Sequence, residues 1–279
     1  MAHGGFVAVV GRPNVGKSTL LNAILGTKVS IVSDKPQTTR AQVRGVLNRD
    51  DAQVVFVDTP GIHKPRTTLG RRLNDTASAS IGDVDVVMLV IDATAKLGPG
   101  DRFVAARVPK DAVVAVNKVD AASSGEVLEQ LARAGELGLS AYFPVSARTG
   151  AGVGELVDHL LGLLPAGPRY FPDDVVTDVP EALWVAELVR EQLLAATHDE
   201  VPHSVACRVT EWEWPYIRCE ILVERDSQRG IVIGKGGSVL KRVGTAVREQ
   251  LPPGAYLELA VKVERDWQRR PKALDRLGF

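Results

Sequence analysis

The chain has 279 residues and a formal net charge of zero, because 34 basic side chains balance 34 acidic ones. Hydrophobic residues make up 45% and charged residues 24% of the chain, as in ordinary globular proteins. No apolar run approaches the roughly 20 residues of a membrane-spanning helix, and the N-terminus lacks a signal-peptide pattern. The two cysteines do not have metal-ligand spacing. We therefore expect a cytoplasmic protein, long enough for two domains with separate cores.

Short Val/Ile-rich runs alternate with helix-length segments in the first part of the chain. Strands are expected at 6–10, 43–47, 54–57, 86–91, 113–116 and 142–145, and helices at 18–25, 68–80, 101–107, 124–135 and 152–164. This alternation predicts an α/β domain with a mostly parallel sheet and helices on both faces. A proline-rich stretch then ends the last helix. The expected domain is 1–165, followed by a linker at 166–180.

The order of elements changes after the linker. The pattern predicts a helix at 181–197, strands at 204–213 and 216–224, a turn of helix, a glycine turn, a helix at 238–251 and a strand at 256–263. The order α-β-β-α-α-β is typical of another fold class. Residues 181–279 are therefore expected to form a smaller, α+β second domain.

Residues 11–18, Gly-Arg-Pro-Asn-Val-Gly-Lys-Ser, fit the phosphate-loop pattern between a predicted strand and a predicted helix. In such a loop, backbone N–H groups and the positive end of the helix surround phosphate oxygens. Lys17 is expected on the β- and γ-phosphates, and the Ser18 hydroxyl on Mg²⁺. The nucleotide-binding residues expected here are Gly11, Asn14, Val15, Gly16, Lys17, Ser18 and Thr19.

Two further segments point to the metal and the γ-phosphate. Asp58 follows the predicted strand 54–57 and can hold Mg²⁺, usually through water, while Gly61 leaves room for an amide to approach the γ-phosphate. The polar loop 30–40 is where a switch threonine should contact both groups, and Thr39 is preferred over Thr38. The expected metal ligands are Ser18, Thr39 and Asp58, and the expected catalytic residues are Lys17, Thr39 and Gly61.

Asn117-Lys-Val-Asp120 ends the predicted strand 113–116 and predicts the choice of base. The Asp120 carboxylate can accept hydrogen bonds from guanine N1–H and its amino group, and adenine offers no such pair. Asn117 can brace the loop, and the Lys118 stem can lie over the base. Ser146 and Ala147 are expected to supply backbone donors to the guanine carbonyl. Four such motifs, in order and each at the end of a strand, indicate a GTPase that binds GTP or GDP with Mg²⁺.

A second glycine turn, Gly234-Lys-Gly-Gly237, lies in a basic segment. Between Arg225 and Arg248 there are six basic residues and one acidic residue, a local charge of +5 that can attract a polyanion. A G-x-x-G loop alone would be read as a helix–helix turn, but the preceding Ile-Val-Ile, the following basic helix and the α-β-β-α-α-β order favour a loop that clamps RNA. The expected RNA-binding residues are Arg229, Gly234, Lys235, Gly236, Gly237, Lys241 and Arg242.

With these segments placed, the chain resembles the Era family of bacterial ribosome-associated GTPases along nearly its whole length. The stretches that carry the resemblance are 11–18, 33–40, 57–61, 81–83, 117–120, 198–204, 221–225, 233–237 and 277–279. The resemblance implies a P-loop GTPase domain and a KH domain of type II, which clamps roughly four nucleotides. It also implies that the KH domain binds the 3′ end of small-subunit ribosomal RNA during maturation of the small ribosomal subunit. Peripheral membrane association, described for the family, is also implied, although no residue indicates it. We expect a monomer.

A residue that could position the attacking water is absent from the expected place. In Ras, a glutamine directly follows the Asp-x-x-Gly glycine, whereas Ile62 stands there in this chain. Hydrolysis is therefore expected to be slow, supported by Mg²⁺, loop amides and Lys17, and Ile62→Ala is expected to change the rate modestly. Related GTPases with Asn at the place of Asn14 can bind K⁺ beside the phosphates. Asn14 is thus a candidate K⁺ ligand or a brace of its own loop.

Two other functions remain open on the residues alone. The chain could be an RNA-binding module in which GTP is a structural ligand, or a membrane-associated cell-cycle signalling GTPase with a repurposed KH domain. Multiple turnover of GTP would exclude the first. Failure to bind the small ribosomal subunit in any nucleotide state would favour the second.

Overall fold

The computed structural model describes residues 3–65, 67–197 and 201–279. The chain forms two compact units, and the division along the main course of the chain falls between Asp178 and Val179. Part of one resemblance-carrying stretch, residues 198–200, lies outside the described residues. Each unit has its own sheet and core.

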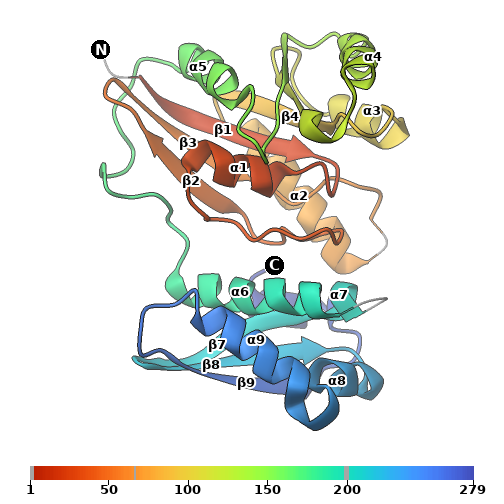
Figure 1. Cartoon of the computed structure of the whole chain (residues 1–279), viewed down its shortest axis with the longest axis vertical. Coiled ribbons are helices and arrows are strands. Elements are labelled where there is room, and N and C mark those ends of the chain that lie inside the picture. Colours follow the sequence, from red (N-terminus) through yellow and green to blue (C-terminus); the bar gives the residue numbers. More distant parts are fainter. Residues whose placement is uncertain (1–2, 66, 198–200) are drawn as a thin grey trace. The chain divides into compact units, whose positions relative to one another are not determined.

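The first unit contains a six-stranded sheet with the order β2-β3-β1-β4-β5-β6 (Figure 1). Its strands are β1 His3–Gly11, β2 Val43–Asn48, β3 Ala52–Asp58, β4 Val86–Asp92, β5 Val113–Asn117 and β6 Ala141–Pro144. Only the edge strand β2 pairs in the antiparallel sense within this sheet. The central strands are mostly apolar because both faces of a parallel sheet are covered.

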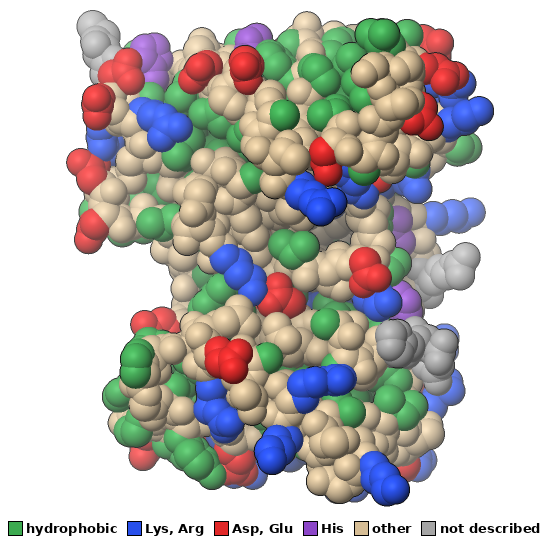
Figure 2. All heavy atoms as spheres, viewed as in Figure 1, with side chains coloured by type: hydrophobic (Ala, Val, Ile, Leu, Met, Phe, Trp, Pro, Cys, Tyr) green, Lys and Arg blue, Asp and Glu red, His purple; other side chains and the backbone are tan. Residues whose placement is uncertain are grey.

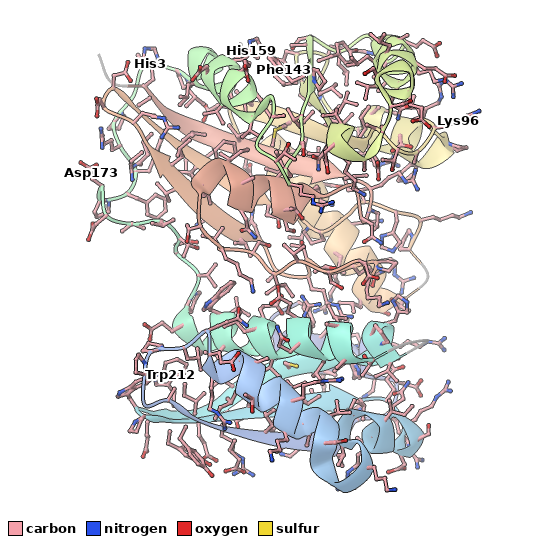
Figure 3. The ribbon with its side chains drawn as sticks, viewed as in Figure 1. His3, Lys96, Phe143, His159, Asp173 and Trp212 are labelled. Atoms are coloured by element: carbon pink, nitrogen blue, oxygen red, sulfur yellow. The ribbon has the colours of Figure 1, made fainter. Side chains whose placement is uncertain are left out.

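Helices cover both faces of this sheet. They are α1 Lys17–Leu25, α2 Thr68–Gly82, α3 Pro99–Ala105, α4 Ser124–Gly135 and α5 Val153–Leu163, with a short 3-10 turn, η1, at Val119–Ala121. Helices α1 and α5 lie on one face, and α2, α3 and α4 lie on the other (Figure 1). Phe143 of β6 and His159 of α5 lie side by side, with ring centroids 4.9 Å apart (Figure 3). The predicted α/β class is therefore confirmed for this unit.

The segment expected to be a linker packs against the first unit. The Gln53 side-chain oxygen accepts a hydrogen bond from the Tyr170 backbone N–H at 2.6 Å, and the Val46 N–H donates to the Val176 carbonyl at 2.8 Å. Residues up to Asp178 accordingly belong to the first unit. The prolines predict where the helix ends. They do not indicate which distant residues form hydrogen bonds with the backbone of the segment.

The second unit has a three-stranded sheet in the order β7-β8-β9, antiparallel between β7 and β8 and parallel between β8 and β9. Its elements are α6 Glu181–Ala196, α7 Val201–Ser204, β7 Ala206–Glu213, β8 Tyr216–Val223, α8 Asp226–Ile233, the 3-10 turn η2 Lys235–Gly237, α9 Ser238–Arg248, β9 Tyr256–Val263, the 3-10 turn η3 Trp267–Arg269 and α10 Pro271–Leu277. Helices α6 and α9 pack on the same face of the sheet (Figure 1). The expected α-β-β-α-α-β order is present.

The C-terminal segment contains helix α10, which the sequence pattern did not predict. Trp267, immediately before it, is fully buried, and its indole N–H donates to the Ser204 carbonyl at 2.9 Å. Leu274 of α10 is also fully buried. The segment therefore packs on the second unit through these apolar side chains, while its charged residues Asp266, Arg269, Arg270 and Lys272 are exposed. None of the helices within the described residues is long and apolar enough to cross a membrane.

Candidate functional site

The predicted nucleotide motifs meet at one edge of the first sheet. Gly11 ends β1, Asp58 ends β3 and Asn117 ends β5, and these three strands run parallel. The carboxyl ends of parallel strands form the crevice in which open α/β sheets bind ligands. Helix α1 begins at Lys17 directly after the phosphate loop, so that Ser18 and Thr19 lie in its first turn. Its free N–H groups and dipole make this end suited to phosphate.

The Asn117 side chain forms hydrogen bonds with two of the predicted segments. Its side chain is almost fully buried, its amide nitrogen donates to the Val15 carbonyl at 3.0 Å, and its amide oxygen accepts from the Ala147 N–H at 3.0 Å. The phosphate loop and the segment that begins at Ser146 are thus held by one side chain. This geometry agrees with the bracing role expected for Asn117.

The residues expected to recognise the base surround the same edge. Ser146 Oγ donates to Asp120 Oδ1 at 2.6 Å, which orients the carboxylate. The Lys118 ammonium donates to the Asn14 carbonyl at 2.7 Å and lies 2.6 Å from Asp92 Oδ2. Asp92 was not among the predicted site residues, although it ends a buried strand, the same signal that identified Asp58.

The three expected metal ligands lie within hydrogen-bonding distance of one another. Asp58 Oδ2 accepts from Ser18 Oγ at 2.7 Å and from Thr39 Oγ1 at 3.3 Å, and these two hydroxyls are 2.8 Å apart. Ser30, which the sequence analysis missed, also donates to Asp58 Oδ2 at 2.9 Å. The Thr38 hydroxyl donates to the Lys35 carbonyl instead, so the geometry favours Thr39 as the switch threonine.

The donor set of this cluster fits Mg²⁺. Mg²⁺ takes oxygen ligands and is commonly held by one or two carboxylates together with phosphates and waters. Asp58 is fully buried, yet its Oδ1 atom has no hydrogen-bond partner within the described residues. A buried carboxylate oxygen without a donor is costly. A cation, or a water bound to it, would satisfy that oxygen.

Lys17 is the only cation of the phosphate loop that is buried. Its ammonium donates to the Arg12 carbonyl at 3.1 Å, inside the loop. Burial lowers the pKa of Lys17 to about 8, although the nearby Asp58 carboxylate opposes the shift. Burial likewise raises the pKa of Asp58. Both groups would be stabilised in their charged forms by the phosphates and the metal that they are expected to bind.

We expect the buried Lys17 ammonium to make nucleotide affinity depend on pH. The ammonium form pairs with phosphate, so binding raises the Lys17 pKa above its free value of about 8. Above that pH the free protein must take up a proton to bind, and we expect the Kd for GDP to rise by up to about tenfold per pH unit. Fluorescence titration between pH 7 and 9.5 would measure it. In Lys17→Arg, whose cation does not titrate in this range, the residual affinity should not change with pH. A flat profile in the unmodified protein would contradict the assignment.

Gly61 and Ile62 lie beside the phosphate loop. A Cβ atom on Gly61 would come within 2.7 Å of the Pro13 backbone nitrogen, so this close approach requires glycine. The Ile62 N–H donates to the Gly11 carbonyl at 3.1 Å, while the Ile62 side chain is buried in the core. Truncation to alanine would cost about 2–5 kcal/mol of stability. The prediction that Ile62→Ala changes the hydrolysis rate modestly therefore applies only at temperatures at which the variant is folded.

The predicted RNA-binding residues form a separate surface in the second unit. Arg229 on α8, Lys235 in the glycine turn, and Lys241 and Arg242 on α9 are all exposed. Within the described residues, none of these four side chains has an ion-pair partner. Figure 2 shows Lys and Arg side chains over the region where α8 and α9 lie. Unpaired, exposed cations beside a glycine turn can contact a phosphate backbone.

The glycine turn has backbone angles that suit close approach. Gly236 has φ of 60° and Gly237 has φ of 79°, both left-handed. A cavity of about 220 Å³ lies between α9 and β9, lined by Leu240, Lys241, Gly244, Arg248, Leu257 and Leu259. An apolar groove flanked by cations is the surface on which KH domains hold bases and backbone.

Comparison with known proteins supports the assignment of both units. Residues 6–118 match the family described as "50S ribosome-binding GTPase", and residues 200–268 match the KH domain family. The chain is 48% identical to GTPase Era of Mycobacterium tuberculosis (strain ATCC 25618 / H37Rv) and 49% identical to GTPase Era of Mycobacterium avium (strain 104). Each alignment covers 99% of this chain, and 99% and 98% of the respective relatives.

Two crystal structures resemble the whole chain. One is Era in complex with MgGDPNP and nucleotides 1506–1542 of 16S ribosomal RNA, with a TM-score of 0.95, 40% identity and coverage of 100% of this chain and 99% of that one. The other is a variant of Aquifex aeolicus Era bound to GDP·AlF4⁻, with a TM-score of 0.92, 40% identity and 99% coverage of both chains.

The fold and the site together define a P-loop GTPase that carries a C-terminal KH domain. The sequence matches narrow this class further, because near-half identity extends over the full length of both domains. The chain belongs to the Era family of GTPases.

Proposed function

We propose that this chain is a GTP-hydrolysing switch that binds small-subunit ribosomal RNA near its 3′ end and assists assembly of the small ribosomal subunit. The observation that carries the proposal is the presence, in one chain, of the Ser18–Thr39–Asp58 cluster and of the basic surface around the glycine turn 234–237, whose cations have no ion-pair partner within the described residues. The full-length relative bound to MgGDPNP and 16S ribosomal RNA supports the pairing of these two ligands.

The nucleotide site would bind GTP or GDP with Mg²⁺. The phosphate-loop amides and Lys17 would hold the phosphates, Asp120 the guanine edge, and Ser18, Thr39 and Asp58 the metal. When bound, Mg²⁺ supplies positive charge that stabilises the phosphates as the bond to the leaving oxygen breaks. The buried Asp58 Oδ1 atom, which lacks a donor, supports this assignment.

Hydrolysis would depend on fixed charges and amides. Water attacks the γ-phosphorus, the bond to the β-phosphate oxygen breaks, and GDP and inorganic phosphate leave. Lys17 would stabilise the charge on the transferring group. The backbone amide after Gly61, which donates to the Gly11 carbonyl at 3.1 Å in this structure, would have to turn toward a γ-phosphate oxygen to contribute. Because Ile62 is buried and apolar, its side chain cannot orient the water. We therefore expect slow intrinsic turnover, because the side chain directly after Gly61 cannot position the attacking water.

We expect K⁺ to accelerate hydrolysis by at least about tenfold over Na⁺, because a cation beside the phosphates can supply the charge of an arginine finger. Asn14→Ala should abolish the difference. Asn14 has φ of 66°, and alanine is strained there, so Asn14→Gly serves as a second variant that accommodates this backbone. Turnover in matched K⁺ and Na⁺ buffers is the measurement. Identical rates would leave Asn14 as a brace of the loop.

The RNA would lie along the glycine turn and helix α9. Lys235, Lys241 and Arg242 would contact phosphates, while bases enter the groove between α9 and β9. We place the protein in the cytoplasm, where the small ribosomal subunit assembles, and expect it to act as a monomer. Peripheral association with the inner face of the cell membrane remains part of the family resemblance, and no described residue supports it.

Two measurements test the proposed function. The first is multiple turnover of GTP by the purified chain, and the second is cosedimentation with the small ribosomal subunit in the GTP-bound and GDP-bound states, with sequencing of RNA that copurifies. Absent turnover would favour an RNA-binding module with a structural nucleotide. Turnover without binding to the subunit in any nucleotide state would favour a signalling GTPase.

A further inference from the structure

A carboxylate at the end of strand β4 faces the loop expected to hold the base. Asp92 is the last residue of β4, and its Oδ2 atom lies 2.6 Å from the Lys118 ammonium. The same ammonium donates to the Asn14 carbonyl at 2.7 Å. One charged group therefore connects the end of β4, the base-binding loop and the phosphate loop.

Asp92 is itself held firmly. Its Oδ1 atom accepts hydrogen bonds from the Thr94 backbone N–H at 2.9 Å and from the Thr94 hydroxyl at 2.7 Å. Its main-chain carbonyl accepts from Gln130 Nε2 at 2.9 Å. Gln130 projects from α4, is almost fully buried, and also donates to the Ala95 carbonyl at 2.8 Å. The carboxylate is thus fixed to the scaffold.

Lys118 would have more freedom without this partner. Its side chain retains 35% of its exposure, whereas the Asp92 side chain retains 17%. A lysine ammonium on a flexible stem can turn to water when no acceptor holds it. The Asn14 carbonyl alone is one neutral acceptor, and a hydrogen bond between two charged groups is stronger.

We propose that Asp92 is a positioning residue for guanine nucleotides. The Asp92 carboxylate holds the Lys118 ammonium at the Asn14 carbonyl. The aliphatic stem of Lys118 is thereby fixed along one face of the base-binding loop. The inference rests on the proposed nucleotide function and deepens it, because it assigns control of nucleotide residence time to a residue outside the four motifs. GDP and GTP share the base, so Asp92 acts on both equally.

The test is the substitution Asp92→Asn in the full chain. Dissociation of N-methylanthraniloyl-labelled GDP and of a labelled non-hydrolysable GTP analogue should become about tenfold faster, by the same factor for both. The loss should appear in dissociation and KM rather than in kcat at saturating GTP, because Lys17 and the Ser18–Thr39–Asp58 cluster form no hydrogen bond or ion pair with Asp92 or Lys118 within the described residues. Glu136→Gln is the matched control. Glu136 forms an exposed ion pair with Arg102, 3.2 Å apart, in the same unit, and its substitution should leave dissociation unchanged.

A double-mutant cycle separates this role from general stabilisation. Lys118→Met removes the ammonium and keeps an apolar stem. If Asp92 acts through Lys118, adding Asp92→Asn to Lys118→Met should not accelerate dissociation further. Independent, multiplying effects would overturn the proposal, as would unchanged dissociation in Asp92→Asn, with or without a lower melting temperature.

The proposed function and this inference fail in different ways. If the unmodified chain binds no guanine nucleotide, the proposed function fails. If it binds GDP tightly and Asp92→Asn binds it equally well, only the positioning role of Asp92 fails.

Discussion

Asp120→Asn is expected to weaken GTP binding by about 10²–10⁴-fold, because two charge-assisted hydrogen bonds to guanine are each worth about 1.5–3 kcal/mol. The variant should gain affinity for xanthosine triphosphate, since the amide N–H₂ can donate to the carbonyl that replaces the guanine amino group. Ser146 Oγ donates to Asp120 Oδ1 at 2.6 Å, and an amide oxygen can accept the same bond. The loop should therefore keep its conformation while the base preference changes.

Competition between GTP and xanthosine triphosphate for a labelled nucleotide measures this preference. Asp111→Asn is the matched control, because Asp111 is an exposed carboxylate in the same unit, before strand β5. It should leave both affinities unchanged. An Asp120→Asn protein that still prefers GTP as strongly as the unmodified chain does would contradict the assignment of Asp120 to the base.

Lys235→Asp combined with Gly236→Asp is expected to reduce RNA affinity by about 100-fold or more at moderate salt. The pair changes the local charge by three units where phosphates are expected to lie closest to the backbone. Gly236 has φ of 60° with no atom within 4 Å of an added Cβ, and Asp tolerates this left-handed region better than most residues. The variant should therefore fold and bind GTP normally.

Filter binding with single-stranded RNA of the small-subunit 3′ end tests the clamp. The control is Lys96→Asp with Gly138→Asp in the first unit, which makes the same change of charge. Lys96 is exposed, and Gly138 has φ of 63° with open space around it. If RNA affinity falls equally in both double variants, the loss comes from the change in net charge. That result would contradict a specific clamp at the glycine turn.

Local sequence patterns predicted most elements of the first unit well, and the reason is clear at α4. The helix expected at 124–135 is observed at Ser124–Gly135, because Ser123 and Glu126 cap its first turn reciprocally. The strands of the sheet were visible as continuous apolar runs because both of their faces are buried. The nucleotide motifs were predictable for a related reason, since each combines a local spacing with the end of a strand.

Some features of the site depended on contacts between distant segments. Ser30 donates to Asp58, and Asp92 lies beside Lys118, but nothing in the neighbouring residues of the sequence indicates either pair. The preference for Thr39 over Thr38 likewise gained support only when the Thr38 hydroxyl was found on the Lys35 carbonyl. Such pairs arise from the order in which strands assemble in the sheet, and local patterns carry little information about that order.

By itself, the sequence determined the α/β class of the first domain, the α-β-β-α-α-β order of the second, and the two candidate sites, because periodicity and spacing are local properties. Only the tertiary structure decided that residues 166–178 pack on the first unit, that Ile62 is a core residue, and that α10 follows a buried Trp267. In each case the deciding quantity is burial against residues far away in the chain. Burial depends on which surfaces meet after folding, and charged or proline-rich composition indicates exposure only when no such partner surface exists.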